Sequence, residues 1–126
     1  MIDYVSVYIT DIEEAAGFYN AVLATLSYKQ YAKYSDIIAY GKGNINFILT
    51  LSNTHYCPQN SNPIHIAFSA ANMQQVDDFH NTALIHGGKT ERKPAFREHP
   101  CGEVYTTGVQ DIFGYKLEAV YKYPKG

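Results

Sequence analysis

The sequence predicts an α+β fold made of two similar halves. When the chain is shifted by 61 residues along itself, the apolar pattern of the two halves coincides, with Phe18 on Phe79 and Leu23 on Leu84. In each half, an alternating strand is followed by an amphipathic helix and then by about three short strands. Strands that are grouped after a helix favour antiparallel neighbours, so we expect mostly antiparallel sheets and not a doubly wound parallel one.

The first half opens with residues 4–9, whose alternation predicts a strand with one apolar face under the following helix. Thr10 or Asp11 can cap that helix, because a side-chain oxygen there accepts a free backbone N–H. The apolar stripe of the helix consists of Ile12, Ala15, Ala16, Tyr19, Val22, Leu23 and Leu26. Short strands are expected near 27–33, 37–41 and 45–51.

The second half repeats this order. Residues 64–69 alternate like residues 4–9, and Asn72 can cap the helix that follows. The helical stripe consists of Met73, Val76, His80, Ala83 and Leu84. Gly87 and Gly88 end the helix, and strands are expected near 88–93, 103–109 and 115–121.

These elements divide the chain into two modules within one domain, residues 1–126. Module one covers about 1–52 and module two about 63–122, and the Pro-containing stretch 53–62 is expected to link them. A chain of 126 residues is long enough to bury a core without disulfide or metal staples.

Composition excludes several classes of protein. The apolar fraction is 46% and the charged fraction 17%, which excludes a disordered chain. The apolar runs are only a few residues long, so we expect no membrane span. The net charge of −2 gives no electrostatic footprint for nucleic acid or for an anionic membrane surface.

The cysteines and the N-terminal residues favour a cytoplasmic location. The chain opens without a basic stretch followed by an apolar one, so no secretory signal is expected. Cys57 and Cys101 do not make a disulfide framework, and we interpret them as two free thiols in a reducing compartment. A bridge between them is the alternative.

Two consecutive β-α-β-β-β modules resemble the vicinal oxygen chelate superfamily, which contains glyoxalase I, the bleomycin-resistance proteins and the extradiol dioxygenases. The resemblance lies in the opening IDYVSV at 2–7, the helical pair Phe18-Tyr19, the strand IHIAF at 64–68 and the ending DIFGYKLEAV at 111–120. The ending resembles the family's Asp-Pro-x-Gly turn and its Glu-bearing last strand, with Ile112 where Pro is usual.

The resemblance implies that the two sheets curl around a cleft that holds one divalent metal, such as Zn, Ni, Fe or Mn. The family's ligands come from the first and last strand of each module, in the order His, Glu or Gln, His, Glu. Carried over to this sequence, His65 matches the third position and Glu118 the fourth, and Glu118 would also act in catalysis. Tyr4 stands at the first position, and Phe47 or Ile48 at the second.

The first module therefore lacks both expected ligands. A phenol such as that of Tyr4 must ionise before it binds a metal, and neither Phe nor Ile can bind one. His99 is the best replacement ligand in the stretch 96–101, which we expect to be a loop beside the cleft. The rival interpretation is an ion pair of Glu118 with His65 or Lys116 in a cleft without metal.

Other residues are candidates for ligand binding. Arg97 can hold a substrate carboxylate in a bidentate geometry, and Tyr8 and Tyr105 are expected to line the cavity or the interface between the modules. His99 from the same expected loop is a further substrate-binding candidate.

Two functions follow from these residues. The first is a metal-dependent enzyme of the lyase, isomerase or dioxygenase type, with an unknown small-molecule substrate. Its metal ligands would be His65 and Glu118, with Tyr4 or His99 completing the set. The second is a metal-free small-molecule binding protein of the bleomycin-resistance type, with a Tyr-lined cleft and no cofactor. The resemblance also implies a homodimer.

Overall fold

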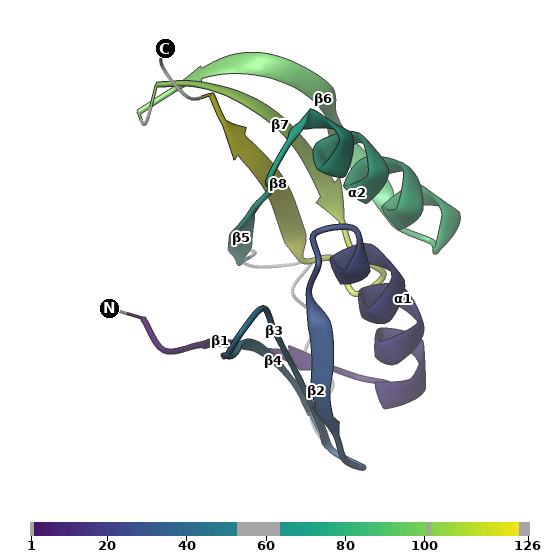
Figure 1. The fold of residues 1–126 in the computed structure, drawn as a ribbon. Helices are drawn as coiled ribbons and strands as arrows, with labels where there is room; N and C mark the ends of the chain where they lie inside the picture. Colours follow the sequence, from purple (N-terminus) through teal and green to yellow (C-terminus); the bar gives the residue numbers. More distant parts are fainter. Residues whose placement is uncertain (1, 53–63, 101, 124–126) are drawn as a thin grey trace.

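Each half of the chain forms a helix and a four-stranded sheet. The computed structural model describes residues 2–52, 64–100 and 102–123. The first module contains β1 (Val5–Ile9), α1 (Ile12–Ala24), β2 (Lys29–Lys33), β3 (Ile37–Gly41) and β4 (Ile45–Leu51). The second contains β5 (His65–Ser69), α2 (Met73–Ile85), β6 (Lys89–His99), β7 (Gly102–Gln110) and β8 (Lys116–Lys122) (Figure 1). The predicted pair of β-α-β-β-β modules is confirmed.

The two sheets have the same topology. The strand orders are β1-β4-β3-β2 and β5-β8-β7-β6. In each sheet the first and last strands of the module pair in parallel, and the other two pairings are antiparallel, as the sequence predicted for most of the sheet. The sheets remain separate and neither closes into a barrel.

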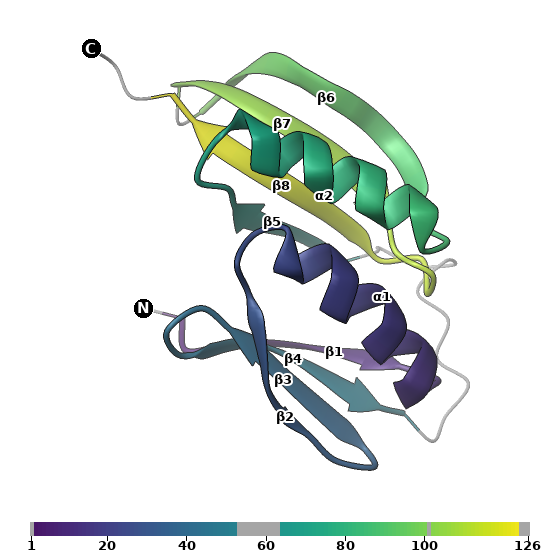
Figure 2. The same ribbon diagram turned by 45° about the vertical axis from the view of Figure 1, so that its right-hand side comes forward.

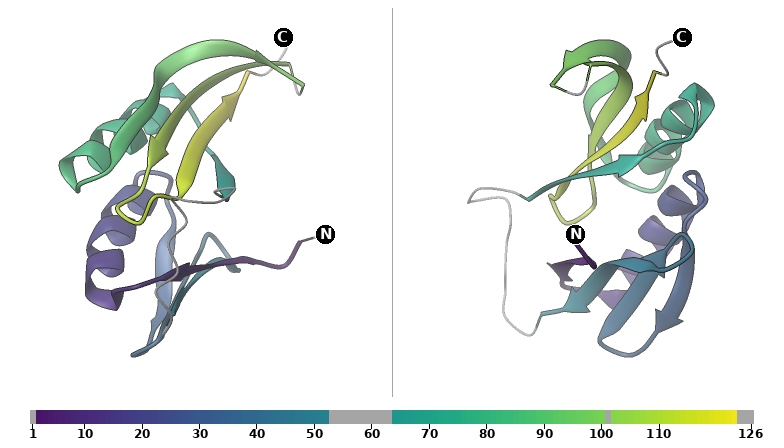
Figure 3. Two further views of the ribbon diagram at one scale, coloured as in Figure 1. Left: turned by 180° about the vertical axis from the view of Figure 1, so that it is seen from behind. Right: turned by 60° about the vertical axis from the view of Figure 1, so that its left-hand side comes forward.

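Each helix covers one face of its own sheet. Asp11 caps α1 by accepting the N–H of Glu14, and Asn72 caps α2 by accepting the N–H of Gln75. The helices contact each other and lie one above the other along one side of the molecule, with the sheets spread on the other side (Figures 2 and 3). The second face of each sheet is called its helix-free face below.

The core lies between the helices and the sheets. Its largest fully buried side chains are Tyr19, Tyr40, Tyr115, Phe18, Phe47, Phe79, Ile9, Leu23, Leu26, Ile38, Leu49 and Leu117. Aromatic rings join the modules, since Phe47 of β4 stands edge-on to Phe68 of β5 with ring centroids 5.3 Å apart. Tyr28 of the first module also packs edge-on against Phe68, at 5.6 Å.

A buried hydrogen-bond cluster forms a second connection between the modules. The Tyr19 hydroxyl on α1 donates to Oδ2 of Asp111, which lies in the β7–β8 turn. Oδ1 of Asp111 accepts the N–H groups of Phe113 at 2.9 Å and Tyr115 at 2.8 Å. The Tyr115 hydroxyl donates to the carbonyl of Tyr8 in β1 at 2.6 Å. Burial raises the pKa of Asp111, and burial together with the nearby Asp111 charge raises the pKa of Tyr19.

Two details of the second module differ from the sequence prediction. The sequence predicts a loop at 96–101, but β6 continues as far as His99, which pairs with Gly102 of β7. Leu84 was placed on the buried stripe of α2, but it is 39% exposed. Phe79 fills the core instead, at the position that Phe18 holds in α1. Only one side of a helix can face the sheet, and Leu84 lies outside that side.

Among the described residues, no helix is long and apolar enough to cross a membrane. The linker 53–62 and both cysteines, Cys57 and Cys101, lie outside the described residues.

Candidate binding site on the second sheet

Glu118 and His65 meet on the helix-free face of the second sheet. Because β5 and β8 are parallel, Ala67 stands opposite Glu118 and His65 opposite Lys116. The alternation of side chains therefore puts His65 and Glu118 on one face. His65 Nε2 lies 3.0 Å from Glu118 Oε1, within hydrogen-bond distance.

The Glu118 carboxylate is buried, with only 7% of the residue exposed. The hydroxyl of Thr106, on β7, donates a hydrogen bond to Glu118 Oε2 at 2.6 Å. A buried carboxylate without partners is costly, so the contacts with His65 and Thr106 are what keep Glu118 in this strand. This pairing is the His–Glu interpretation that the sequence left as a rival to metal binding.

Arg92 adds a fixed positive charge beside Glu118. Its Nη2 lies 3.7 Å from Glu118 Oε1, which is longer than a hydrogen bond. The guanidinium lies over Gly108, the residue that stands between Arg92 and Glu118 in the sheet register. A Cβ at Gly108 would lie 3.1 Å from Nη2, so the absence of a side chain there gives the guanidinium room.

A small pocket of about 150 Å³ opens next to these residues. His65, Arg92, Gly108 and Lys116 contribute to its lining together with Glu91. Lys116 Nζ lies 3.9 Å from Glu91 Oε1, and the side-chain amide of Gln110 donates to that same oxygen at 2.6 Å. The volume is smaller than the roughly 300–1,000 Å³ of pockets that enclose drug-sized ligands, so it suits one functional group of a ligand.

The first sheet has no comparable polar cluster at the matching positions. Ser6 stands opposite Ile48 as Ala67 stands opposite Glu118, so Ile48, rather than Phe47, is the counterpart of Glu118. Phe47 points into the core. Tyr4, the counterpart of His65, precedes β1 and is 55% exposed.

The other predicted site residues lie in several places. The register puts Arg97 on the helix-free face, two residues along β6 from Ala95, and His99 on the same face at the end of the strand. Tyr105 points to the opposite face, where its hydroxyl donates to Asp77 of α2 at 2.7 Å, and this bond raises the pKa of Tyr105. Tyr8 lies on the helix-free face of the first sheet and is 55% exposed.

Several residues of this cluster were not predicted as site residues. Arg92 lies between two bulges of β6, one between Thr90 and Arg92 and one before Ala95, whereas Thr106 and Gly108 lie in β7, which pairs regularly with β8. The charged run at 91–93 was the only sequence feature that pointed to Arg92. Alternation alone could not show which face of the sheet its side chains take.

A divalent metal needs more donors than this cluster supplies. His65 and Glu118 are two ligands, whereas catalytic zinc sites use three protein ligands and an open position. In the ranges 2–52, 64–100 and 102–123, no group of three or more His, Cys, Asp or Glu side chains could hold a metal ion. The guanidinium of Arg92 also stands beside the carboxylate oxygen that would bind the ion. These residues therefore do not fit the four-ligand centre.

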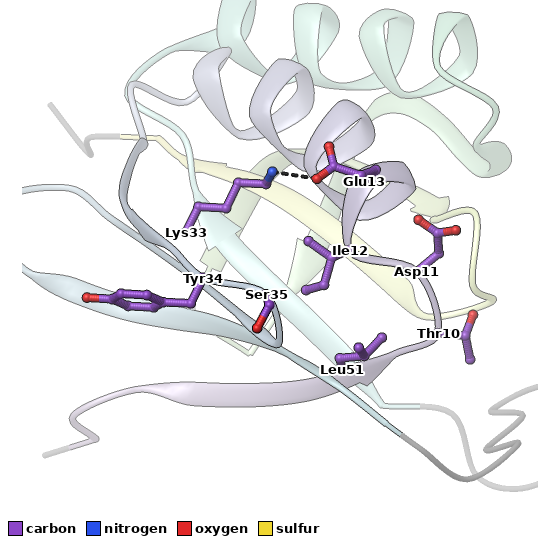
Figure 4. A pocket seen from close by; sticks show the side chains of 8 residues that line it. All are labelled: Thr10, Asp11, Ile12, Glu13, Lys33, Tyr34, Ser35 and Leu51. Carbon is purple, nitrogen blue, oxygen red and sulfur yellow. Dashed lines mark hydrogen bonds and ion pairs between the residues drawn. The ribbon is translucent and has the colours of Figure 1, made fainter.

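A larger depression, of about 580 Å³, lies in the first module between the start of α1 and the β2–β3 turn (Figure 4). Its charged groups are engaged within the protein, since Lys33 Nζ lies 2.6 Å from Glu13 Oε1 and Asp11 caps α1. None of its lining residues is a predicted site residue. The second sheet is therefore the better candidate for a site.

Solved structures share this architecture. A glyoxalase/bleomycin resistance protein from Albidiferax ferrireducens T118 superimposes with a TM-score of 0.85 and 27% identity, covering 97% of this chain and 99% of that one. A glyoxalase/bleomycin resistance protein/dioxygenase from Alicyclobacillus acidocaldarius gives 0.67 and 20%, covering 98% and 92%. A lactoylglutathione lyase from Agrobacterium tumefaciens gives 0.66 and 17%, covering 96% and 92%. The last two likenesses show the fold alone.

Among curated proteins, no sequence match reaches significance. The family model described as the glyoxalase/bleomycin resistance protein/dioxygenase superfamily matches residues 1–119, nearly the whole chain. This match agrees with the tandem modules and with the superimposed structures. The chain therefore belongs to the glyoxalase/bleomycin resistance protein/dioxygenase superfamily.

Proposed function

We propose that this protein binds a small molecule, without a metal, on the helix-free face of its second sheet. The observation that carries the proposal is the state of Glu118. Its two oxygens are already held by His65 and Thr106, with the Arg92 guanidinium nearby. A carboxylate held in this way organises the donor groups around it, and two of them, His65 and Arg92, line the pocket.

The roles of the residues follow from their contacts. Glu118 is a positioning residue that orients the imidazole of His65 and attracts Arg92, and Thr106 fixes the carboxylate. His65 has a half-exposed side chain, so one side of its ring is accessible to a ligand in the pocket. The alternative function, a lyase, isomerase or dioxygenase, would need a metal. The metal-binding measurement described next therefore tests both functions.

Metal binding should be absent or weak. Protein purified without a tag or chelator and incubated separately with Zn, Ni, Mn and anaerobic Fe(II) is expected to retain well under one metal per chain, because two donors beside an arginine hold such ions poorly. Elemental analysis after desalting measures this ratio, and the thermal midpoint should be the same with and without EDTA.

Glu118→Gln and His65→Ala are the matched controls for this measurement. One metal per chain in the wild type that both variants lose would contradict the proposal and would support the metal-dependent enzyme. A metal that all three proteins retain equally would lie elsewhere and would leave this site metal-free.

We also propose that the protein is a cytoplasmic homodimer. Support for association comes from β1 and the residues before it, where Ile2, Tyr4 and Tyr8 are large exposed side chains. Light scattering coupled to size-exclusion chromatography should give about twice the chain mass of 14.2 kDa. Replacing both Tyr4 and Tyr8 by Ser should shift the measured mass toward that of the monomer. A wild-type mass equal to that of one chain would refute the dimer.

A further inference from the structure

We infer that Arg92 receives an oxyanion of the ligand, so that the ligand is an organic molecule with a carboxylate or phosphoryl group. The inference rests on the proposed function, because it names the ligand class of the same site. In this arrangement the guanidinium of Arg92 supplies the positive charge at the pocket. The ligand oxygens would bind the side of the guanidinium that faces away from Glu118.

The first support is the charge of the helix-free face. Among residues whose face follows from the strand register and the side-chain contacts, this face of the second sheet carries five cationic side chains and two carboxylates. The cations are Lys89, Arg92, Arg97, Lys116 and Lys122, and the carboxylates are Glu91 and Glu118. The whole chain has a net charge of −2, so the positive charge is concentrated on this face and favours an anionic ligand.

The second support is that the cations at the pocket are only partly neutralised. Arg92 approaches Glu118 at 3.7 Å and Lys116 approaches Glu91 at 3.9 Å. Both separations exceed hydrogen-bond distance, and the two cationic side chains are 41% and 46% exposed. Their N–H donors are therefore available to an acceptor that enters from solvent.

The third support is geometric. Arg92, Lys116 and His65 approach one pocket from three strands, β6, β8 and β5. A planar guanidinium forms two parallel hydrogen bonds to a carboxylate or phosphoryl group, and an ammonium and an imidazole can each add one. A pocket of about 150 Å³ has room for such a headgroup, while the rest of the ligand would extend over the sheet.

Glu118 and Gly108 position Arg92 for this contact. The Glu118 carboxylate attracts the guanidinium, and Gly108 lets it lie flat against β7. Gly108→Ala would place a methyl group 3.1 Å from Nη2 and displace the guanidinium by a few tenths of an ångström. We expect this variant to weaken anion binding by several-fold while the sheet stays folded.

Calorimetric titration with four probes tests the inference. The anionic probes are inorganic phosphate, phenyl phosphate and benzoate, and the neutral probe is benzyl alcohol, each in the same concentration of NaCl. Phenyl phosphate and benzoate should bind at least about tenfold more tightly than benzyl alcohol, as expected for hydrogen bonds to a charged group. Phosphate alone should bind more weakly, because it lacks an apolar part.

The variants separate Arg92 from general charge effects. Arg92→Gln should weaken the binding of both anionic aromatic probes at least about tenfold, and Arg92→Lys should give an intermediate affinity, because it keeps the charge but loses the planar fork. Lys42→Gln is the matched control, since Lys42 is an exposed cation in the β3–β4 turn of the other module. It should leave both affinities unchanged.

Equal binding of benzoate and benzyl alcohol, or equal losses in Arg92→Gln and Lys42→Gln, would overturn the inference. Equal binding of benzoate and benzyl alcohol that EDTA does not change would leave the proposed metal-free function intact. Stoichiometric metal binding through Glu118 would instead refute the proposed function itself, so the two failures are distinguishable.

Discussion

Asp111→Ala is expected to lower the free energy of unfolding by about 3 kcal/mol. The substitution leaves three donors without their acceptor, the hydroxyl of Tyr19 and the backbone N–H groups of Phe113 and Tyr115. A buried donor that loses its acceptor costs roughly 1–3 kcal/mol, and the N–H of Phe113, in the half-buried turn 112–114, can recover part of that cost through water. Urea unfolding followed by circular dichroism, with the slope compared between proteins, measures the change.

Asp111→Asn is the matched control for this prediction. The amide oxygen can still accept the two backbone N–H groups, and the amide nitrogen can donate to Tyr19, so the loss should be at most about 1 kcal/mol. A loss in Asp111→Asn as large as in Asp111→Ala would show that the charge matters more than the three hydrogen bonds.

The pH dependence of stability has a defined sign. Burial raises the pKa of folded Asp111 above the ordinary value of 3.8. The folded state therefore binds a proton more tightly than the unfolded state. Its stabilising effect is fully present below pH 3.8 and is lost as the pH rises through the folded pKa. The stability of the wild type relative to Asp111→Asn should thus fall over that window and level off above it, and a rise would contradict the assignment.

Phe47→Ala is expected to lower the free energy of unfolding by about 4 kcal/mol, because it removes a large ring from a closely packed core. Phe47 is 1% exposed. Its ring centroid lies 5.4 Å from that of Tyr19 and 5.3 Å from that of Phe68. The cavity would open between the modules, where neither sheet can move in to fill it. The loss of unfolding free energy should therefore be large for a large-to-small core substitution.

Ile48→Ala is the control from the next position along β4. Its side chain lies on the helix-free face and is only half buried, so the loss should stay below about 2 kcal/mol. Equal losses at the two positions would mean that the two faces of the first sheet are packed to the same degree. The same urea unfolding experiment measures both variants.

The fold could be predicted from the sequence because its signals are local and occur twice. The repeat places Phe18 and Phe79 at equivalent buried positions, and each helix begins at a capping side chain that the sequence shows. The strands 37–41 and 45–51 were predicted with the bounds that the structure has. These features depend on nearest neighbours along the chain, where turn chemistry and periodicity are informative.

The site was predicted only in part, because it depends on register between strands far apart in sequence. His65 and Glu118 were expected on one face, and they meet at 3.0 Å. Arg92 was not expected there, since two bulges in β6 change which side chains share a face. Tyr105 was expected near a cavity or the module interface, yet its hydroxyl reaches Asp77 on the helix side. Metal binding by His65 and Glu118 is a prediction that the elemental analysis tests.

The bond from Tyr19 to Asp111 has a consequence for how the molecule unfolds. The first module supplies the hydroxyl, and the second module supplies the turn that needs it. Unfolding either half would leave buried polar groups of the other half unpaired, and would also expose the Phe47–Phe68 contact. The two halves are therefore thermodynamically dependent on each other. Calorimetry should show one cooperative unfolding transition for the whole chain, with equal calorimetric and van't Hoff enthalpies. A single module expressed alone should not reach a stable folded state.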